Sequence, residues 1–135
     1  MAKAFNKFNS TVEALAHKKH DLSADQIKVA LTNILPVAAN SVLVNITEVD
    51  YTYCSSRNIT TASSGQTDGT YVLVLTDLEI SASGGVVGPF RYIVLYNDTA
   101  SNDELLGWSD YGSSITLADG EKITLDFAEN IFTLA

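Results

Sequence analysis

Between residues 84 and 127, hydrophobic and polar positions alternate in short runs separated by residues that favour turns. Residues 90–97 are largely apolar on both faces of an extended segment, as in a central strand covered on both sides. Residues 97–103 contain no apolar side chain larger than Ala and predict a hairpin loop. Asp119-Gly120 lies between two alternating runs and predicts a two-residue hairpin. The stretch therefore predicts an antiparallel β-meander, with strands at 90–97, 105–111, 115–117 and 123–127 and a break at 112–114.

Near the N-terminus the pattern changes to the spacing of an amphipathic helix. Apolar residues recur every three or four positions and form one stripe. Asn9 or Ser10 could cap this helix, and Glu13 would complete a capping box with Ser10. We expect one helix over about residues 5–20, with a stripe made of Phe5, Phe8, Val12, Leu15 and Ala16.

The middle of the chain predicts further strands. Residues 27–32 alternate as a strand that ends before Pro36, whereas residues 37–49 suit either a strand or one helical turn. Residues 51–69 are polar and predict a long exposed loop or an irregular edge hairpin closed by Asp68-Gly69. Residues 71–80 predict a long strand, and residues 130–134 a last short one. About seven strands with regular turns predict a single all-β domain, 1–135, folded as an antiparallel β-sandwich with the N-terminal helix at its edge or end.

Composition excludes several classes of protein. With 135 residues, of which 46% are hydrophobic, the chain can bury a core without metals or disulfides, and its single cysteine, Cys54, cannot form an intrachain disulfide. No stretch approaches the roughly 20 apolar residues of a membrane span, so we expect a soluble protein with no membrane partner. The formal net charge of −8 argues against nucleic acid as a partner.

Candidate chemistry is sparse. His17 and His20 stand three apart on the predicted helix, but no other residue of suitable spacing completes a zinc site. The oxygen-rich loop 98–104 does not match the spacing of an EF-hand, and a solvated hairpin tip explains it better. No phosphate loop, nucleophile elbow or Cys–His pair is present. We therefore expect no enzyme activity, no cofactor and no metal, and we expect Trp108 to lie in the core or in a subunit interface.

Two long blocks of the chain resemble a family of small structural proteins of tailed bacteriophages. Residues 5–49, FNKFNSTVEALAHKKHDLSADQIKVALTNILPVAANSVLVNITEV, are similar to its "KVALTN..P.A.N.VL..ITE" block. Residues 80–127, ISASGGVVGPFRYIVLYNDTASNDELLGWSDYGSSITLADGEKITLDF, are similar to its "GPFRY.VLYNDT...LIGW.DYGSS.TL.DGE...DF" block. Between them, DYTYCSSRNITTASSG stands where relatives often have a glycine-rich turn.

The resemblance implies a virion component, and we expect a capsid cement or decoration protein that binds the major capsid protein lattice and stabilises the head. Such a protein would be made in the host bacterial cytoplasm, reside on the capsid surface and act as a homo-oligomer, for which we expect a trimer. Loop 51–69 and the N-terminal segment are then the surfaces expected to reach the capsid, with Phe5, Tyr51, Tyr53 and Arg57 as candidate contacts. The alternatives are a tail or neck protein of the phage, and a carbohydrate-binding module that uses the aromatic side chains.

Overall fold

The computed structural model describes residues 5–127 and 132–134, and they form antiparallel sheets with one α-helix. The predicted all-β class with one helix is confirmed. The described strands are β1 (Asn6–Lys7), β2 (Ile27–Thr32), β3 (Asn58–Ile59), β4 (Thr61–Thr67), β5 (Thr70–Leu75), β6 (Leu78–Ser81), β7 (Val87–Asn97), β8 (Leu105–Leu117), β9 (Lys122–Leu125) and β10 (Phe132–Leu134). The helix α1 spans Ser10–Ala16, and a 3-10 turn, η1, spans Leu43–Asn45.

One layer is a five-stranded sheet with the order β1-β8-β7-β2-β3. Its centre is β7, which pairs with β8 on one side and with β2 on the other. The last six residues of β7, 92–97, are all buried. This agrees with the prediction that residues 90–97 form a central strand covered on both faces.

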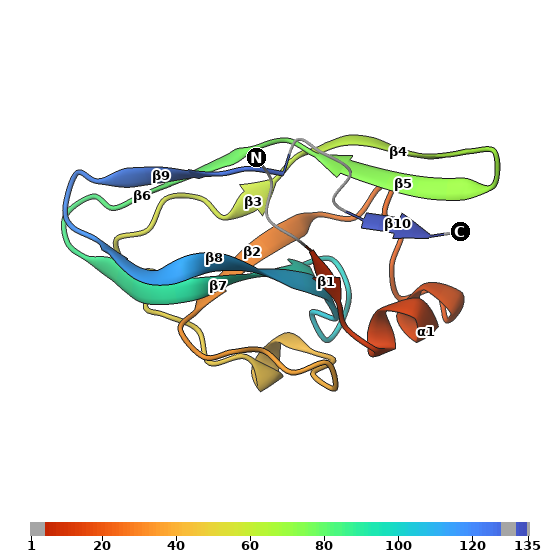
Figure 1. Ribbon diagram of the computed structural model, residues 1–135, viewed down its shortest axis with the longest axis horizontal. Helices are drawn as coiled ribbons and strands as arrows, with labels where there is room; N and C mark the ends of the chain where they lie inside the picture. Colours follow the sequence, from red (N-terminus) through yellow and green to blue (C-terminus); the bar gives the residue numbers. More distant parts are fainter. Residues whose placement is uncertain (1–4, 128–131, 135) are drawn as a thin grey trace.

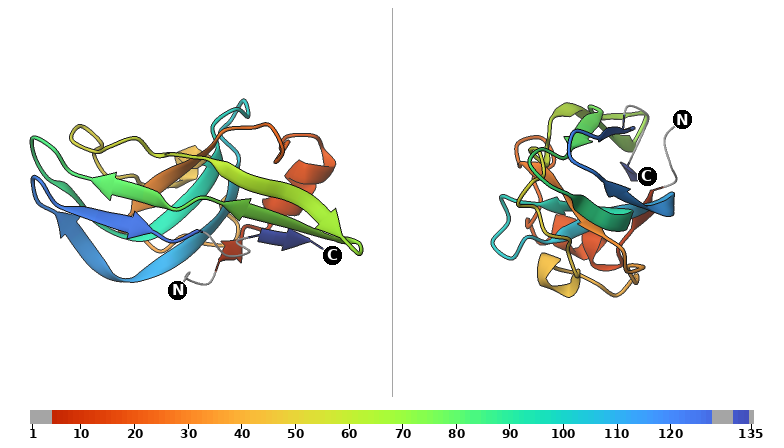
Figure 2. Two further views of the ribbon diagram at one scale, coloured as in Figure 1. Left: turned by 90° about the horizontal axis from the view of Figure 1, so that it is seen from above. Right: turned by 90° about the vertical axis from the view of Figure 1, so that its left-hand side faces the viewer.

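The other layer consists of two smaller sheets, β10-β5-β4 and β6-β9, which lie across one face of the five-stranded sheet (Figure 1). The main core fills the space between the layers and draws on both of them. Its members include Leu31 of β2, Ile93 of β7, Leu75 of β5, Ile80 of β6 and Leu125 of β9. The view along the long axis in Figure 2 shows how the strands surround this interior.

The opposite face of the five-stranded sheet is also covered. A second cluster packs there, under the segment that connects β2 to η1 and continues past it. Two backbone hydrogen bonds fasten this segment to the β7–β8 end of the sheet, from Leu43 N to Asp103 O at 3.1 Å and from Leu105 N to Ser41 O at 3.0 Å. The buried members of the cluster are Phe8, Ala30, Ile46, Val94, Tyr96 and Leu105.

The N-terminal helix is shorter than predicted. The prediction of a helix over about 5–20 was wrong at both ends. Residues 6 and 7 form β1 against β8, the helix begins at Ser10, and it ends at Ala16. Asn9 occupies the N-cap position without a side-chain hydrogen bond, so the capping box does not form. Thr11 and Ala14 face the protein, whereas Val12, placed in the predicted stripe, is 53% exposed.

The meander was only partly predicted. Asp119-Gly120 does form a turn, with Gly120 at a φ of +89°, but β9 leaves β8 and pairs with β6 instead. Residues 112–114 do not break the strand, because the register shift between β7 and β8 absorbs them as a bulge around Gly112, whose φ is +109°. Alternation along residues 90–97 predicted that Phe90 and Val94 share a face. Register shifts on both sides of Phe90 place it instead in the main core with Ile93, whereas Val94 lies in the second cluster.

Four other predicted segments can be compared with the structure. Within 51–69, the edge-hairpin alternative holds for β4, which Asp68-Gly69 joins to β5. The predicted strand 71–80 is two strands in different sheets, β5 and β6, interrupted at Thr76-Asp77. Between 37 and 49 the structure has one 3-10 turn rather than a strand. The predicted strand 130–134 is present as β10, and its first two residues lie outside the described part of the chain.

Candidate functional site

Tyr51 and Arg57, two of the predicted contact residues, lie against each other. The guanidinium carbon of Arg57 is 3.6 Å from the centroid of the Tyr51 ring, which is cation–π geometry. The Tyr51 hydroxyl donates to Glu48 Oε1 at 2.7 Å and accepts from the Leu31 backbone N–H at 2.9 Å. Both side chains therefore hold the segment after η1 against β2.

Arg57 is further committed to the protein itself. Its Nη1 donates to the Val29 carbonyl at 2.7 Å and lies 3.8 Å from Glu48 Oε1, and its side chain is only 15% exposed. Burial raises the pKa of the Tyr51 hydroxyl above its ordinary value, so the ring acts as a neutral hydrogen-bonding group. Tyr51 and Arg57 therefore stabilise the fold through contacts within the chain.

Tyr53 is the exposed member of the predicted set, with 44% of its surface accessible. Its ring lies over Gly84 and Gly85, and a methyl group on Gly85 would overlap it. Its carbonyl accepts a hydrogen bond from Ser83 N at 3.0 Å, and the neighbouring Val86 is 54% exposed. An exposed apolar area is thus present where β6 connects to β7.

Phe5 belongs to a different part of the fold. It is half-buried, packs against the main core and lies so close to Gly107 that a methyl group there would overlap its ring. The structure therefore brings Tyr51 and Arg57 together and leaves Tyr53 and Phe5 on other elements. Their role as partner contacts stays a prediction.

Sequence reasoning missed the apolar loop, which we define as residues 34–44. Four large hydrophobic side chains in this stretch are more than half exposed: Ile34 (59%), Leu35 (55%), Val37 (55%) and Val44 (87%). Asn40 Oδ1 accepts from Val37 N at 2.9 Å, and Asn45 Oδ1 accepts from Ser41 N at 3.0 Å. The loop is therefore held by its own side chains and presents its apolar groups outward. The signal in the sequence was the apolar pair Ile34-Leu35 followed by Pro36, just after a strand that had already ended.

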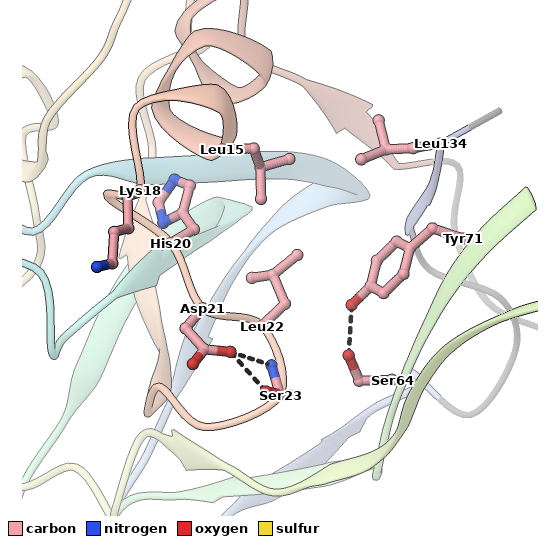
Figure 3. A pocket seen from close by; sticks show the side chains of 9 residues that line it. All are labelled: Leu15, Lys18, His20, Asp21, Leu22, Ser23, Ser64, Tyr71 and Leu134. Atoms are coloured by element: carbon pink, nitrogen blue, oxygen red, sulfur yellow. Dashed lines mark hydrogen bonds between the residues drawn. The ribbon is translucent and has the colours of Figure 1, made fainter.

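Figure 3 shows a pocket of about 490 Å³ where α1 and the turn after it face β5 and β10. Leu15, Leu22, Tyr71 and Leu134 contribute its apolar wall. Much of its polar rim is bonded internally: Ser64 Oγ lies 2.7 Å from the Tyr71 hydroxyl, and Asp21 Oδ1 accepts from Ser23 N at 3.1 Å. The pocket offers an apolar surface and no obvious reactive pair.

A polar cluster lies beneath the β7–β8 loop. Asn97 is fully buried, and its Oδ1 accepts from the backbone N–H groups of Thr99 and Ala100 at 3.0 and 3.1 Å. Its Nδ2 donates to Asp25 Oδ2 at 2.6 Å and lies 3.0 Å from His20 Nδ1. Burial, as the largest cause, lowers the pKa of His20, although Glu104 and Asp25 oppose that shift. The cluster fixes the loop that follows β7.

The metal sites considered from the sequence do not assemble. His17 is exposed, with its Nδ1 4.0 Å from Glu13 Oε1, whereas His20 is buried against Asn97. In the oxygen-rich loop, Glu104 turns inward and its Oε1 accepts from Asn102 N at 3.0 Å. Across residues 5–127 and 132–134, no three His, Cys, Asp or Glu side chains are grouped to hold a metal ion.

Within the same described ranges, no helix has the length and apolar character needed to cross a bilayer. Comparison of the chain with protein-family models, curated proteins and solved structures finds no match. What the protein does is therefore inferred from its residues and their geometry.

Proposed function

We propose that this protein is a non-enzymatic structural component of a tailed-bacteriophage virion, a capsid cement or decoration protein that binds the major capsid protein lattice. The resemblance of residues 5–49 and 80–127 to the phage family supports this proposal. On the same grounds, the protein acts as a homo-oligomer on the outer surface of the head.

The observation that carries the proposal is the apolar loop. Four large apolar side chains more than half exposed within eleven residues, 34–44, are unusual on a surface that stays in water. Such groups gain free energy when a partner protein covers them. The loop is also fastened to the sheet through Ser41 and Leu43, so little conformational freedom is lost on binding.

Charge supports the same partner class. A chain with a formal charge of −8 is attracted to basic patches on another protein and repelled by polyanions such as packaged DNA. Attachment to the outer face of a protein shell satisfies both conditions. Many weak contacts by an oligomer would then add up to tight attachment.

Sedimentation with empty heads, assembled from the major capsid protein encoded with this chain, tests the proposal. The wild-type protein is expected to pellet with the heads. Leu35→Ser should weaken this binding about tenfold or more, since the side chain is half exposed in the free protein and becomes buried on the lattice.

Val86→Ser is the matched variant, because Val86 is 54% exposed, close to the 55% of Leu35, but directly follows Gly85, over which the Tyr53 ring lies. If only Val86→Ser weakens binding, the contact is on the Tyr53 side and the apolar loop is not the docking surface. If the wild-type protein does not bind heads at all, the capsid proposal is wrong. A glycan array probed with the same protein tests the carbohydrate-binding alternative.

A further inference from the structure

β4 is the longest of the strands that end a sheet in the described part of the chain. β4 ends the sheet order β10-β5-β4, so only one of its sides is paired. It has seven residues, whereas the other strands that end a sheet, β1, β3, β6, β9 and β10, have two to four. Each unpaired N–H and C=O along such an edge can bond to another strand.

This edge lacks the usual protection against pairing. Proteins place charged residues or proline on exposed edges to prevent association. The sequence of β4, TASSGQT, contains neither, and its bulge lies at the start, between Thr61 and Ser63. The other exposed small sheet differs, because β6 carries Glu79 and β9 carries Lys122, whose charged groups are 3.7 Å apart.

The edge is also accessible and rigid. The β4–β5 hairpin reaches beyond α1 and β10 at one end of the molecule (Figures 1 and 2). Its turn is tight, with Asp68 and Gly69 both at positive φ, and Gly69 N donates to Gln66 Oε1 at 3.0 Å. Because the strand is already ordered, pairing costs little conformational entropy.

We propose that two copies of this protein associate by antiparallel pairing of their β4 edges, which joins two three-stranded sheets into one six-stranded sheet. This inference rests on the homo-oligomer part of the proposed function and names the contact, and a two-fold contact of this kind gives a dimer in place of the trimer that the resemblance implies. A two-fold axis near Ser64 places Ser63 opposite Gly65 of the other copy, and the bulge between Thr61 and Ser63 lies at the end of this pairing.

The absence of charge on β4 allows a second copy to pair there. Each chain has a formal net charge of −8, so most contacts between two copies bring like charges together. The seven residues of β4 contain no ionisable side chain, and self-pairing there avoids that cost. Small side chains on both edges also let the backbones approach to the 4.7–4.9 Å spacing of adjacent strands.

Residue 63 provides a specific test. Ser63 is exposed, and its two copies would lie diagonally across the axis, roughly 7–8 Å apart. Ser63→Lys and Ser63→Glu should each weaken dimerisation about tenfold or more, because like charges then face each other. An equimolar mixture of the two variants should associate again, whereas Ser63→Thr, the uncharged control, should dimerise like wild type. Sedimentation equilibrium over a range of concentrations measures all four.

Hydrogen exchange of the wild-type protein gives a readout that needs no variant. Amides of β4 should exchange more slowly at concentrations where the dimer forms, and those of β6 should not change. A wild-type protein that stays monomeric, or an oligomer that neither Ser63→Lys nor Ser63→Glu weakens, would overturn the β4 contact. Binding to empty heads is a separate measurement, so loss of the capsid proposal leaves a β4 dimer intact, and the reverse also holds.

Discussion

Asn97 presents its amide nitrogen, not its oxygen, to Nδ1 of His20 at 3.0 Å. Two backbone N–H groups, those of Thr99 and Ala100, occupy the Asn97 oxygen and fix the orientation of the amide. Nδ1 must therefore accept the hydrogen bond, and neutral His20 carries its proton on Nε2. Protonation of Nδ1 would place two donors against each other, in addition to the cost of burying the charge.

The first prediction concerns pH. Burial lowers the pKa of His20 from its ordinary value of 6.5. At a pH between the pKa of His20 in the folded protein and its pKa in the unfolded chain, the folded protein therefore binds fewer protons than the unfolded chain. The His20 contribution to the free energy of unfolding is therefore complete above pH 6.5, decreases as the pH falls below it and levels off below the folded pKa. Each unit of pKa difference corresponds to about 1.4 kcal/mol.

Urea denaturation from about pH 7.5 to pH 5 measures this contribution as the difference between wild type and His20→Gln. His17→Gln, which replaces the exposed imidazole after α1, is the control and should follow wild type. Equal pH dependence in wild type and His20→Gln would show that His20 does not cause the pH dependence of the free energy of unfolding.

The second prediction separates the two tyrosines of the loop after η1. Tyr51→Phe removes a hydroxyl that bonds to both Leu31 N and Glu48, and it should lower the free energy of unfolding by about 1–3 kcal/mol. Tyr53→Phe, at an exposed ring that lies over Gly84 and Gly85, should change it by less than about 0.5 kcal/mol. Thermal melts of the two variants provide the comparison, and equal losses of stability would contradict the stabilising role assigned to Tyr51 and Arg57.

The third prediction concerns Trp108, whose ring meets Tyr92 edge-on with centroids 5.9 Å apart. It packs against the second cluster, which contains Phe8 and Val94, but is only partly buried. Trp108→Ala should therefore cost about 2 kcal/mol, less than the roughly 3–5 kcal/mol of a fully buried aromatic residue. Trp108→Phe should recover much of this loss. If the alanine variant melts like wild type but loses glycan binding, the Trp108 side chain binds a ligand and does not stabilise the fold.

The fourth prediction uses two glycines with aromatic neighbours. Alanine at Gly107 would overlap the Phe5 ring and lie 2.6 Å from the Asn6 carbonyl oxygen, whereas the three atoms nearest an alanine at Gly85 all belong to the Tyr53 ring. A backbone carbonyl in a paired strand moves less easily than an exposed ring. Gly107→Ala should cost about 2 kcal/mol or more, and Gly85→Ala about 1 kcal/mol.

A double-mutant cycle completes this test. In a Tyr53→Ala background, Gly85→Ala should become nearly neutral, because its steric conflict is removed. Free energies of unfolding from chemical denaturation give the coupling energy. A penalty for Gly85→Ala that persists without the ring would show that it comes from the backbone at residue 85.

The sequence predicted what depends on local patterns. Largely apolar side chains on both faces of residues 90–97 identified the central strand, and the turn residues at 97–103 identified the hairpin that follows it. Asp68-Gly69 marked a turn at the end of a segment predicted as either a loop or an edge hairpin. Each of these features is determined within about ten residues of the chain. Alternation and turn chemistry are enough to reveal them.

The errors arose where a distant partner decides the structure. Phe8 fits a helical stripe by spacing, but the residues before it, Asn6 and Lys7, pair with β8 as β1. Gly107 has no side chain, which leaves room for the Phe5 ring beside β8. Asp119-Gly120 has the residues of a hairpin, yet β9 pairs with β6, some forty residues earlier in the chain. Local propensity does not reveal which strands will pair.

The candidate contacts were predicted less well than the fold. The polar composition of residues 51–69 predicted that Tyr51 and Arg57 would be exposed, but the Tyr51 hydroxyl bonds to Glu48 and Arg57 bonds to the Val29 carbonyl, which holds both side chains against the protein. The exposed apolar side chains of residues 34–44 could not be told from core residues by hydropathy alone, because burial depends on what packs above them.

Lys7 Nζ donates to the Thr133 carbonyl at 3.2 Å, which joins the first strand of the chain to the last. β1 pairs with β8, and β10 pairs with β5, so a pulling force applied at the two ends acts first on strands of two and three residues. These short pairings should separate before the longer β7–β8 pairing does. Stretched by its ends, the domain should yield in small early steps before its core ruptures.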